Sequence, residues 1–592
     1  MKGSLNKLLL DMKKNVTNFI NGAAILSVAG IIVKILGAIF RIPLTNIIGS
    51  EGMGIYQLAY PMYSFLLVIS SAGFPVAISR LVARAVNTGD YRLANRTFRL
   101  SKVLMFALGF AAMAILAIFS GLIAQKQGNA DSKYVLLAIA PAILFVSVLS
   151  AYRGYFQGMQ NMIPTAVSQI IEQFIKLIAG LGFALYFVRF GKLWGAVGAV
   201  AGVMLSELVA LIYIVILYNG KKKEILSDIH SMQIQTARIS SKQIIKDVVM
   251  IALPVAIGSA ILPLVSMIDQ LIVINGLKDI IADIDGLPFN VQSIIKYAEK
   301  NNVIIDSAMS MTQIASEFSV IYEKFVTSLA TSLYGIMSGT CSPITALPLI
   351  FSTSLAISIV PAVSQAHAKR NAADVRRKSS TSLRLTTLIT FPCAIGLCVL
   401  AEPIIKILYS NYSEWEMLIA IKCLRVMSMT VLALPIIHAA TAILQGLGKQ
   451  NIPVINLALG AVLIKIPLTY FLTKIPSLNI IGAAIGTIAI FVFAAILDVA
   501  SVKYFTGFRL EIMQTFVKPL ISSLIMGAVA LVIYIMLNKA LGHIIISVGA
   551  AIIAGVIIYF AMALITHSIK KKDLEFIPKG ELIAAKLSRF LD

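Results

Sequence analysis

Residues 19–42 read FINGAAILSVAGIIVKILGAIFRI, an apolar run that is long enough to cross a bilayer as one helix. Lys34 lies in the middle of this run, and Arg41 follows two helical turns later on the same face. A charge at membrane depth costs roughly 2.5–3.5 kcal/mol, so such side chains usually face a protein-lined or water-filled cavity. The run therefore predicts a membrane helix with a cationic functional surface.

Similar apolar runs recur along the whole chain. The 592 residues are 58% hydrophobic and 13% charged, with a mean hydropathy of +0.90, whereas soluble proteins contain about 25% charged residues. These values predict an all-α polytopic membrane protein with about fourteen transmembrane helices. The expected spans lie near 20–41, 55–80, 102–124, 134–156, 163–188, 194–218, 247–275, 340–364, 383–401, 419–446, 452–473, 479–502, 515–537 and 544–567.

The net charge of +23 lies mainly in the segments between the spans. The two ends of the chain and the loops 80–102, 219–246 and 365–384 are rich in Lys and Arg, while most of the alternate loops are short and poor in charge. This distribution follows the positive-inside rule and predicts that both termini are cytoplasmic. It also favours a membrane protein over one that binds nucleic acid.

The two halves of the chain resemble each other. Pro164 precedes Lys176 by the same number of residues as Pro453 precedes Lys465. An even number of spans separates the matched segments, as in transporters built from two parallel repeats with the substrate site between them. We expect two pseudo-symmetric six-helix lobes within five regions: an N-terminal lobe (1–218), a basic cytoplasmic linker (219–246), a C-terminal lobe (247–502) with an outer loop (276–335), two further spans (503–567) and a cytoplasmic tail (568–592).

Polar residues gather on one face of the fifth predicted span. Gln169, Glu172, Gln173 and Lys176 recur at short steps that suit a hydrated wall. An alternative is that Glu172 and Lys176 neutralise each other as an intrahelical pair. Lys465 has no carboxylate four residues before it, so its charge must be balanced by another span or by a ligand.

The predicted substrate-binding residues are cationic or amide side chains inside the spans: Lys34, Arg41, Lys176, Lys465, Gln169 and Gln173. The expected proton or sodium carriers are carboxyl groups inside the spans: Glu207, Asp269, Asp498 and Glu172. The alternative is that these acids are ion-pair partners of the membrane lysines, or that Asp498 lies near the cytoplasmic surface. The histidines and the four cysteines show no metal-site spacing, and there is no Walker A motif, so no metal or other cofactor is expected beyond a coupling ion.

Three tyrosines, Tyr56, Tyr60 and Tyr63, fall on one face near the outer end of the second predicted span. They predict an aromatic belt at the membrane interface. The alternative is that these rings stack on a sugar inside a vestibule.

Short motifs are distributed over both halves of the chain: Lys34-Ile-Leu-Gly37 with Arg41-Ile-Pro43, Gly52-Met-Gly54-Ile-Tyr-Gln57, Gly73-Phe-Pro75-Val-Ala-Ile-Ser79-Arg80, Tyr334-Gly335-Ile336, Ser358-Ile-Val-Pro361-Ala-Val-Ser364 and Gln445-Gly446. With these motifs the chain resembles the multidrug/oligosaccharidyl-lipid/polysaccharide exporter superfamily. The similarity is to its polysaccharide-transporter branch, which includes stage V sporulation protein B and the lipid II flippases of Gram-positive bacteria.

The resemblance implies two lobes arranged as a V with two extra C-terminal helices, alternating access, and a lipid tail that rides in a membrane-facing groove. Related flippases use basic residues on the first span to grip a substrate pyrophosphate, which would assign that role to Lys34 and Arg41. The implied location is the bacterial plasma membrane.

We therefore expect a flippase, not an enzyme, that moves a polyprenyl-pyrophosphate-linked saccharide, with lipid II as the first candidate, from the inner to the outer leaflet for cell-wall synthesis. Its expected partners are the lipid-linked oligosaccharide and membrane lipids. A monomer is expected because one chain contains both lobes. The alternatives are a cation-coupled drug exporter, which would favour acidic cavity walls, a membrane glycosyltransferase with a catalytic base in 276–335, and a non-transporting scaffold.

Overall fold

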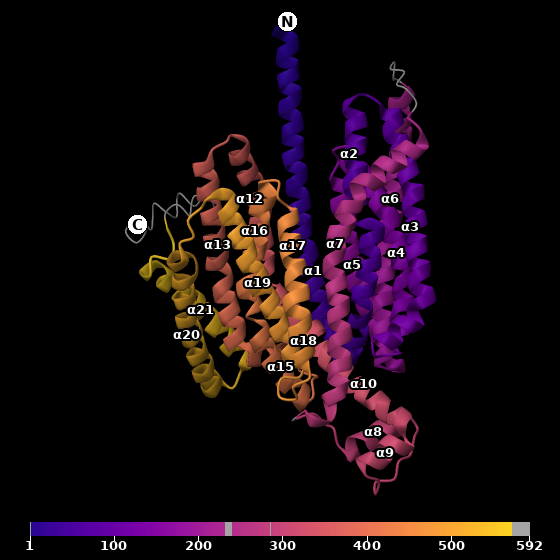
Figure 1. Cartoon of the computed structure of the whole chain (residues 1–592), viewed down its shortest axis with the longest axis vertical. Coiled ribbons are helices and arrows are strands. Elements are labelled where there is room, and N and C mark those ends of the chain that lie inside the picture. Colours follow the sequence, from indigo (N-terminus) through magenta and orange to yellow (C-terminus); the bar gives the residue numbers. More distant parts are fainter. Residues whose placement is uncertain (1, 231–238, 285, 571–592) are drawn as a thin grey trace. The chain divides into compact units, whose positions relative to one another are not determined.

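The computed structural model describes residues 2–230, 239–284 and 286–570, excluding the side chains of 2–24, 27 and 222–230. Every regular element in this part of the chain is a helix (Figure 1). Among them, 13 segments are long and apolar enough to cross a membrane, and the first, Val28–Asn87, covers two of the predicted spans. The all-α membrane fold is confirmed, and the count of fourteen spans stays a prediction.

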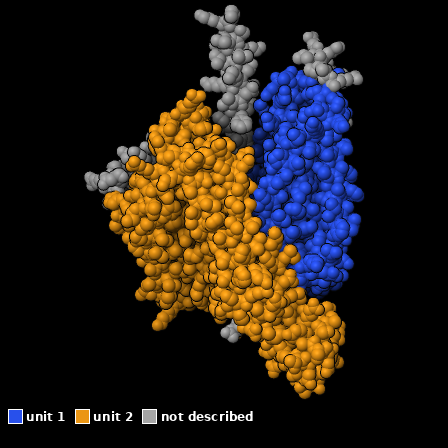
Figure 2. Space-filling model, in the orientation of Figure 1, with its two compact units in different colours: residues 1–48, 55–267 blue, residues 49–54, 268–592 orange. Residues whose placement is uncertain are grey.

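The chain forms two compact units, which are coloured separately in Figure 2. Unit 1 contains residues 1–48 and 55–267, and unit 2 contains residues 49–54 and 268–592. The five regions predicted from the internal repeat stay a prediction. The middle of the predicted basic linker and most of the predicted tail lie outside the described residues.

The first helix, α1 (Lys2–Ser71), is interrupted at a single residue. Gly49 has φ 70° and ψ −178°, a backbone conformation that a residue with a side chain adopts only under strain. Pro43 lies before this break and Pro61 after it. The break separates the two spans that the sequence predicts in this region.

Unit 1 continues with a run of long helices. Its core lies between α2, α3, α4 and α6, where the rings of Tyr152, Tyr155 and Tyr218 lie 4.6–5.0 Å from the ring of the fully buried Phe98, centroid to centroid. The elements are α2 (Phe74–Asn87), α3 (Tyr91–Lys126), α4 (Ser132–Gly158), α5 (Ile163–Phe187), the short η1 (Val188–Phe190), α6 (Lys192–His230) and the part of α7 (Ser241–Ile280) that ends at residue 267.

Unit 2 has its core between α12, α13, α16 and α19, where Val363, Ile443 and Val502 are fully buried. Three of its elements, η3, η4 and η5, are π-helical turns, which are often found at functional sites. From residue 319 its elements are α10 (Ser319–Gly335), η3 (Ile336–Cys341), α11 (Ser342–Ala346), α12 (Leu349–Ala368), α13 (Ala372–Val399), α14 (Ala401–Leu408), α15 (Glu414–Met427), α16 (Thr430–Gly446), α17 (Asn451–Gly460), η4 (Ala461–Lys465), α18 (Ile466–Thr473), α19 (Ile480–Thr506), η5 (Met513–Val517), α20 (Lys518–Leu541) and α21 (Ile544–Ile565).

The predicted outer loop 276–335 is mostly helical. Besides the end of α7 and α10 it contains η2 (Ile281–Asp283), α8 (Val291–Lys300) and α9 (Met311–Glu317), which Figure 1 shows beside α10. The side chain of Asn290 caps α8, and Ser310 with Gln313 forms a capping box on α9. Ile294 and Ile314 are fully buried, so the described part of this region is a folded helical subdomain.

An ionic cluster joins α13 to the segments that flank the last two helices. Glu511 accepts a hydrogen bond from Lys570 at 2.6 Å and pairs with the buried Arg384 at 3.5 Å. The hydrogen bond from Lys570, helped by the charges of Lys570 and Arg384, holds the pKa of Glu511 below its usual value against the opposing effect of partial burial. The Tyr559 hydroxyl of α21 also donates to the Leu388 carbonyl oxygen of α13 at 2.6 Å.

The close contact between α5 and α6 requires glycine. A methyl group on Gly202 would lie 2.3 Å from the Cα of Gly180, whereas one on Gly182 would meet no atom within 4 Å. We expect Gly202→Ala to destabilise the protein by about 1–3 kcal/mol, because the two helix backbones would have to separate. Gly182→Ala is the matched control and should leave stability equal or slightly higher. Melting temperatures in detergent measure both, and equal losses would contradict the packing described.

The lowered pKa of Glu511 makes the effect of its ion cluster depend on pH. A carboxyl whose pKa is depressed by folding stabilises the protein above its unfolded-state pKa, and this contribution disappears as the pH falls through the folded-state pKa. Glu511→Gln should therefore lower the melting temperature at neutral pH, and this loss should shrink as the pH falls through the folded-state pKa of Glu511. Glu299→Gln, at an exposed carboxylate of α8, should be silent at neutral and at acid pH. If Glu511→Gln lowered the melting temperature as much in acid as at neutral pH, the ionised carboxylate of Glu511 would not be the source of the stabilisation.

Candidate functional site

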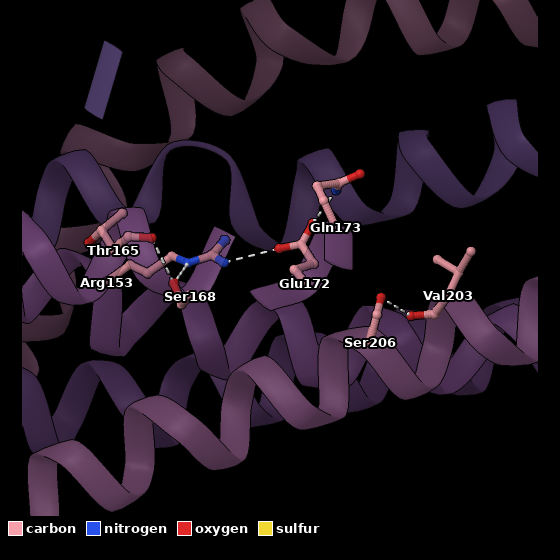
Figure 3. Close-up of polar contacts among 7 residues, drawn as sticks. All are labelled: Arg153, Thr165, Ser168, Glu172, Gln173, Val203 and Ser206. Carbon is pink, nitrogen blue, oxygen red and sulfur yellow. Dashed lines mark hydrogen bonds and ion pairs between the residues drawn. The ribbon is translucent and has the colours of Figure 1, made fainter. Parts of the chain in front are cut away.

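The polar face predicted on α5 exists in unit 1, and its partners come from three other helices. Figure 3 shows its centre, where Arg153 of α4 points toward Glu172 and Gln173 of α5. A guanidinium nitrogen of Arg153 lies 3.0 Å from Glu172 Oε2, and the two side chains are 14% and 17% exposed. The amide of Gln173 donates to the other oxygen, Glu172 Oε1, at 3.1 Å.

The hydroxyl of Ser168 fixes the remaining side of Arg153. The Nε–H of Arg153 donates to Ser168 Oγ at 3.0 Å, and Ser168 donates in turn to the carbonyl oxygen of Thr165 at 2.8 Å (Figure 3). Because the guanidinium is planar, these contacts determine its orientation as well as its charge balance. The structure therefore favours an interhelical partner for Glu172 over the intrahelical pair with Lys176 that the sequence left open.

Lys176 makes a different kind of contact. Its ammonium lies 5.2 Å from the centroid of the Phe40 ring of α1 and beside the Tyr60 hydroxyl. A ring face attracts a cation without neutralising it, at roughly 0.5–2 kcal/mol. Lys176 is half-buried, so it combines a retained charge with some access to solvent or ligand.

The two cations predicted on the first span lie on the same helix as Phe40. Lys34 is exposed and Arg41 is half-buried, with the hydroxyls of Tyr56 and Tyr60 near Arg41. Gly37, between the two cations, faces Gln173 of α5. The face that carries Lys34 and Arg41 therefore adjoins the polar face of α5 within unit 1.

The three tyrosines near this site do not form an interfacial belt. Tyr56 is 1% exposed and Tyr63 is 4% exposed, while Tyr60 is half-buried. Their rings contact one another in sequence, with centroids 5.3 and 5.8 Å apart. The predicted belt is wrong because this helix face packs inside the protein, where the hydroxyls meet Lys176 and Arg41 rather than lipid headgroups.

Glu207 on α6 completes the polar cluster of unit 1. It is 7% exposed, and its Oε2 is buried without a hydrogen-bond partner. The charged groups that face it are Glu172, Arg153 and Lys176. The structure thus brings together four predicted residues, Glu172, Gln173, Lys176 and Glu207, around an arginine. Gln169 is half-buried on α5.

A second polar site lies in unit 2, where η4 ends at Lys465. The ammonium of Lys465 lies 3.1 Å from Asp269 Oδ2 of α7, with the side chains 12% and 11% exposed. The Thr469 hydroxyl donates to the other oxygen, Asp269 Oδ1, at 3.3 Å. The charge of Lys465 is therefore balanced by another span, one of the two alternatives left by the sequence. Coupling through Asp269 stays a prediction.

Asp498 lies inside unit 2 and is fully buried, although the sequence left open a place near the surface. The amide of Asn456 on α17 donates to Asp498 Oδ1 at 2.8 Å, and Oδ2 has no hydrogen-bond partner. A coupling role for Asp498 also stays a prediction.

The sequence alone does not mark Arg153 as a residue of this site. The residue lies near the end of the predicted span 134–156, close to the side of the membrane on which the basic loops are expected. An arginine at such a place is ordinarily an interfacial anchor. The feature of the sequence that could have indicated Arg153 is its position inside a predicted membrane span. That signal does not reveal Glu172 as the partner, because the partner lies on another helix.

The ion pair between Lys465 and Asp269 should be important for stability. We expect Lys465→Met to destabilise the protein by about 3 kcal/mol or more, because it leaves a buried carboxylate unpaired. The double variant Lys465→Met with Asp269→Asn should recover most of the lost stability. The matched control is Lys474→Met, which breaks the exposed pair with Asp279, also between α7 and the end of α18. It should leave the melting temperature unchanged. If Lys465→Met and Lys474→Met lowered the melting temperature equally, the buried ion pair would contribute no more to stability than the exposed one, contrary to this prediction.

Comparison with known proteins places this geometry in a family. Residues 19–281 match the family model "Polysaccharide biosynthesis protein", and residues 307–551 match the model "Lipid II flippase MurJ". The chain is 26% identical to stage V sporulation protein B of Bacillus subtilis (strain 168) over 95% of its own length and 98% of that protein. It is 24% identical to the lipid II flippase MurJ of the same organism, over 86% and 87% of the two chains.

The fold agrees with these sequence matches. A solved structure described as "Lipid II flippase MurJ, inward closed conformation" superposes with a TM-score of 0.64 at 15% identity, covering 92% of this chain and 98% of the other. The resemblance inferred from the short motifs is confirmed. Over most of its length the chain resembles these polysaccharide-biosynthesis and flippase families in sequence, and it resembles solved transporters of the multidrug/oligosaccharidyl-lipid/polysaccharide exporter superfamily in fold.

Proposed function

We propose that the protein is a flippase for a polyprenyl-pyrophosphate-linked saccharide, with lipid II as the first candidate. The observation that carries the proposal is the cationic face of unit 1, where Lys34 and Arg41 of α1 and Lys176 of α5 are exposed or half-buried within membrane helices. A diphosphate with a sugar headgroup cannot cross hydrocarbon unaided, because its charges and hydroxyls lose their hydration. Fixed cations replace part of that hydration with charge-assisted hydrogen bonds.

The balance of charge around these cations supports an anionic substrate. Arg153 binds Glu172 and Ser168 and therefore has a structural role. Lys176 contacts an aromatic ring and a hydroxyl. A cation held by a ring can exchange this contact for a phosphate oxygen at small cost. Such a site suits a drug exporter for cationic compounds poorly, since two like charges would meet in a low-dielectric environment.

Unit 2, taken by itself, contains a groove that suits a hydrocarbon chain. A cavity of about 730 Å³ opens between α13, α20 and α21, and its lining includes Leu388, Leu397, Ile552 and Val556. The groove is lined almost entirely by apolar side chains, so a hydrocarbon chain can enter it without leaving any polar group unpaired. We assign the isoprenoid tail to this groove, which agrees with the implication of the family resemblance.

Lipid II is the preferred substrate within this class because relatives that transport it cover most of the chain, both in sequence and in fold. The same fold and cations would also accept other polyprenyl-pyrophosphate saccharides, since the diphosphate and the tail are common to all of them. The direction of transport, with both termini in the cytoplasm of a bacterial cell, belongs to the same proposal.

A reconstituted flipping assay tests this function. Wild-type protein in proteoliposomes should move fluorescent lipid II to the leaflet where an impermeant quencher reaches it. Lys34→Ala and Arg41→Ala should each lower the rate by about tenfold or more, since each removes a charged hydrogen-bond donor whose contacts contribute roughly 1.5–3 kcal/mol. Lys133→Ala, at an exposed lysine of α4 outside the site, is the matched control and should flip at the wild-type rate.

Each outcome of this assay has a distinct meaning. Flipping that both variants retain in full would refute the assignment of Lys34 and Arg41. Absence of flipping by folded wild-type protein would refute lipid II as the substrate. In that case other polyprenyl-pyrophosphate saccharides would be tested in the same assay, and failure with all of them would refute the transport function.

A further inference from the structure

The environment of Glu207 in the unit 1 cluster is incomplete. The residue is 7% exposed, and its Oε2 lacks a hydrogen-bond partner. An ionised carboxylate in that position would leave a buried charge with a lone pair unsatisfied, which costs several kcal/mol unless a cation compensates. The state of Glu207 therefore depends on the charges around it.

The groups that face Glu207 come from each neighbouring helix. Glu172 and Lys176 face it from α5, Arg153 faces it from α4, and Tyr63 faces it from α1. If both carboxyls and both cations are ionised, the cluster is neutral. Removal of either cation would leave two carboxylates close together, and one of them would then favour the protonated form.

The two cations that face Glu207 are held by different kinds of contact. Arg153 is held by Glu172 at 3.0 Å and by Ser168 at 3.0 Å. Lys176 has a flexible stem, and its contacts are the ring of Phe40 and the hydroxyl of Tyr60. Arg153 and Lys176 both face Glu207, and because Arg153 is paired with Glu172, a displacement of Lys176 changes the charge around Glu207 without breaking that pair.

We propose that Glu207 is a proton-binding site whose occupancy is controlled by Lys176, an inference that rests on the proposed function. When Lys176 turns toward the diphosphate of the substrate, Oε2 of Glu207 takes a proton from water and becomes a neutral carboxylic acid. When the substrate leaves, Lys176 returns and the proton is released to water. The cluster keeps the same net charge in both states, and no oxidant or further reactant takes part.

A proton fits this position better than a sodium ion. Each oxygen of Glu172 already accepts a hydrogen bond, from Arg153 or from Gln173, so fewer of its lone pairs remain to bind a metal ion. A metal cation would also come close to the charge of Arg153 in a low-dielectric environment. A proton needs no additional oxygen ligand and removes the charge of Glu207 altogether.

The consequence is that binding of an anionic substrate and binding of a proton strengthen each other. Linkage is reciprocal, so the affinity for a polyprenyl pyrophosphate should rise as the pH falls. For one linked proton the change is at most about tenfold per pH unit. If substrate binding released a proton instead, the affinity would fall as the pH falls.

Calorimetry on the purified full-length protein tests the proposal directly. Undecaprenyl pyrophosphate is titrated into the protein in detergent, in two buffers with different heats of ionisation, which gives the number of protons taken up. Proton uptake is counted beyond the ionisation of the diphosphate itself, which is common to all variants. On this basis wild-type protein should take up a proton on binding, whereas Glu207→Gln should bind with no such uptake and without the pH dependence of affinity that Glu207 adds. Lys176→Met should also show no uptake, because the cation is already missing in the free protein.

Asp90→Asn provides the matched control. Asp90 is a buried carboxyl of unit 1 at the start of α3, and asparagine also serves as a helix cap there. This variant should take up the proton as wild type does. Melting temperatures establish that Glu207→Gln and Asp90→Asn are folded before the comparison.

The results separate failure of the inference from failure of the function. Absence of binding to folded wild-type protein would overturn the proposed function. Binding without proton uptake, uptake that survives in Glu207→Gln, or uptake that is lost in Asp90→Asn would overturn the role of Glu207 and leave the function standing. Binding heats that depend on the sodium concentration, and not on the buffer, would assign the site to a metal cation and overturn the proposal of a proton site.

Discussion

The cost of placing a charge inside a bilayer determines how the polar residues of this protein are arranged. A membrane helix can carry a lysine or an arginine only where another group supplies what water would have supplied. Arg153 has Glu172, Lys465 has Asp269, and Lys176 has the ring of Phe40. Each of these contacts joins two helices, so the balance of charge also determines which helix faces meet.

Lys176 and Lys465 each follow a proline by the same number of residues, but their contacts in the two units differ. Lys465 meets a carboxylate, which cancels its charge and holds α7 against the α17–α18 segment. Lys176 meets an aromatic ring, which leaves its charge in place. The similarity in sequence therefore does not extend to the contacts of the two lysines. Lys176 keeps its charge beside a ring, whereas Lys465 is neutralised by an ion pair between helices.

The sequence was sufficient to predict the membrane helices and the polar face of α5, because both depend on periodicity along one segment. Glu172, Gln173 and Lys176 do lie on one side of that helix. The partner of Glu172 could not be predicted in the same way. A lysine four residues away on the same helix satisfies every local rule, and only the fold shows that Arg153 reaches the carboxylate from α4.

Two other differences have the same origin. The tyrosines of the second span follow the pattern of an interfacial belt, but burial depends on which helix packs against them, and Tyr56 and Tyr63 are inside. The segment 276–335 is polar enough to be a loop, yet capped short helices with buried isoleucines fold it. In each case the local sequence is compatible with both outcomes, and contacts between distant segments decide between them.

The choice of arginine at position 153 and lysine at position 176 follows from what each position must do. A guanidinium offers several donors in a fixed plane, and here the same group binds the carboxylate of Glu172 and the hydroxyl of Ser168. An ammonium on a flexible stem has no preferred plane and leaves an aromatic ring easily. Exchanging the two types would fix the cation at position 176 and loosen the one that neutralises Glu172. A cluster with one rigid and one mobile cation can change the charge around Glu207 while the helices that build it stay in place.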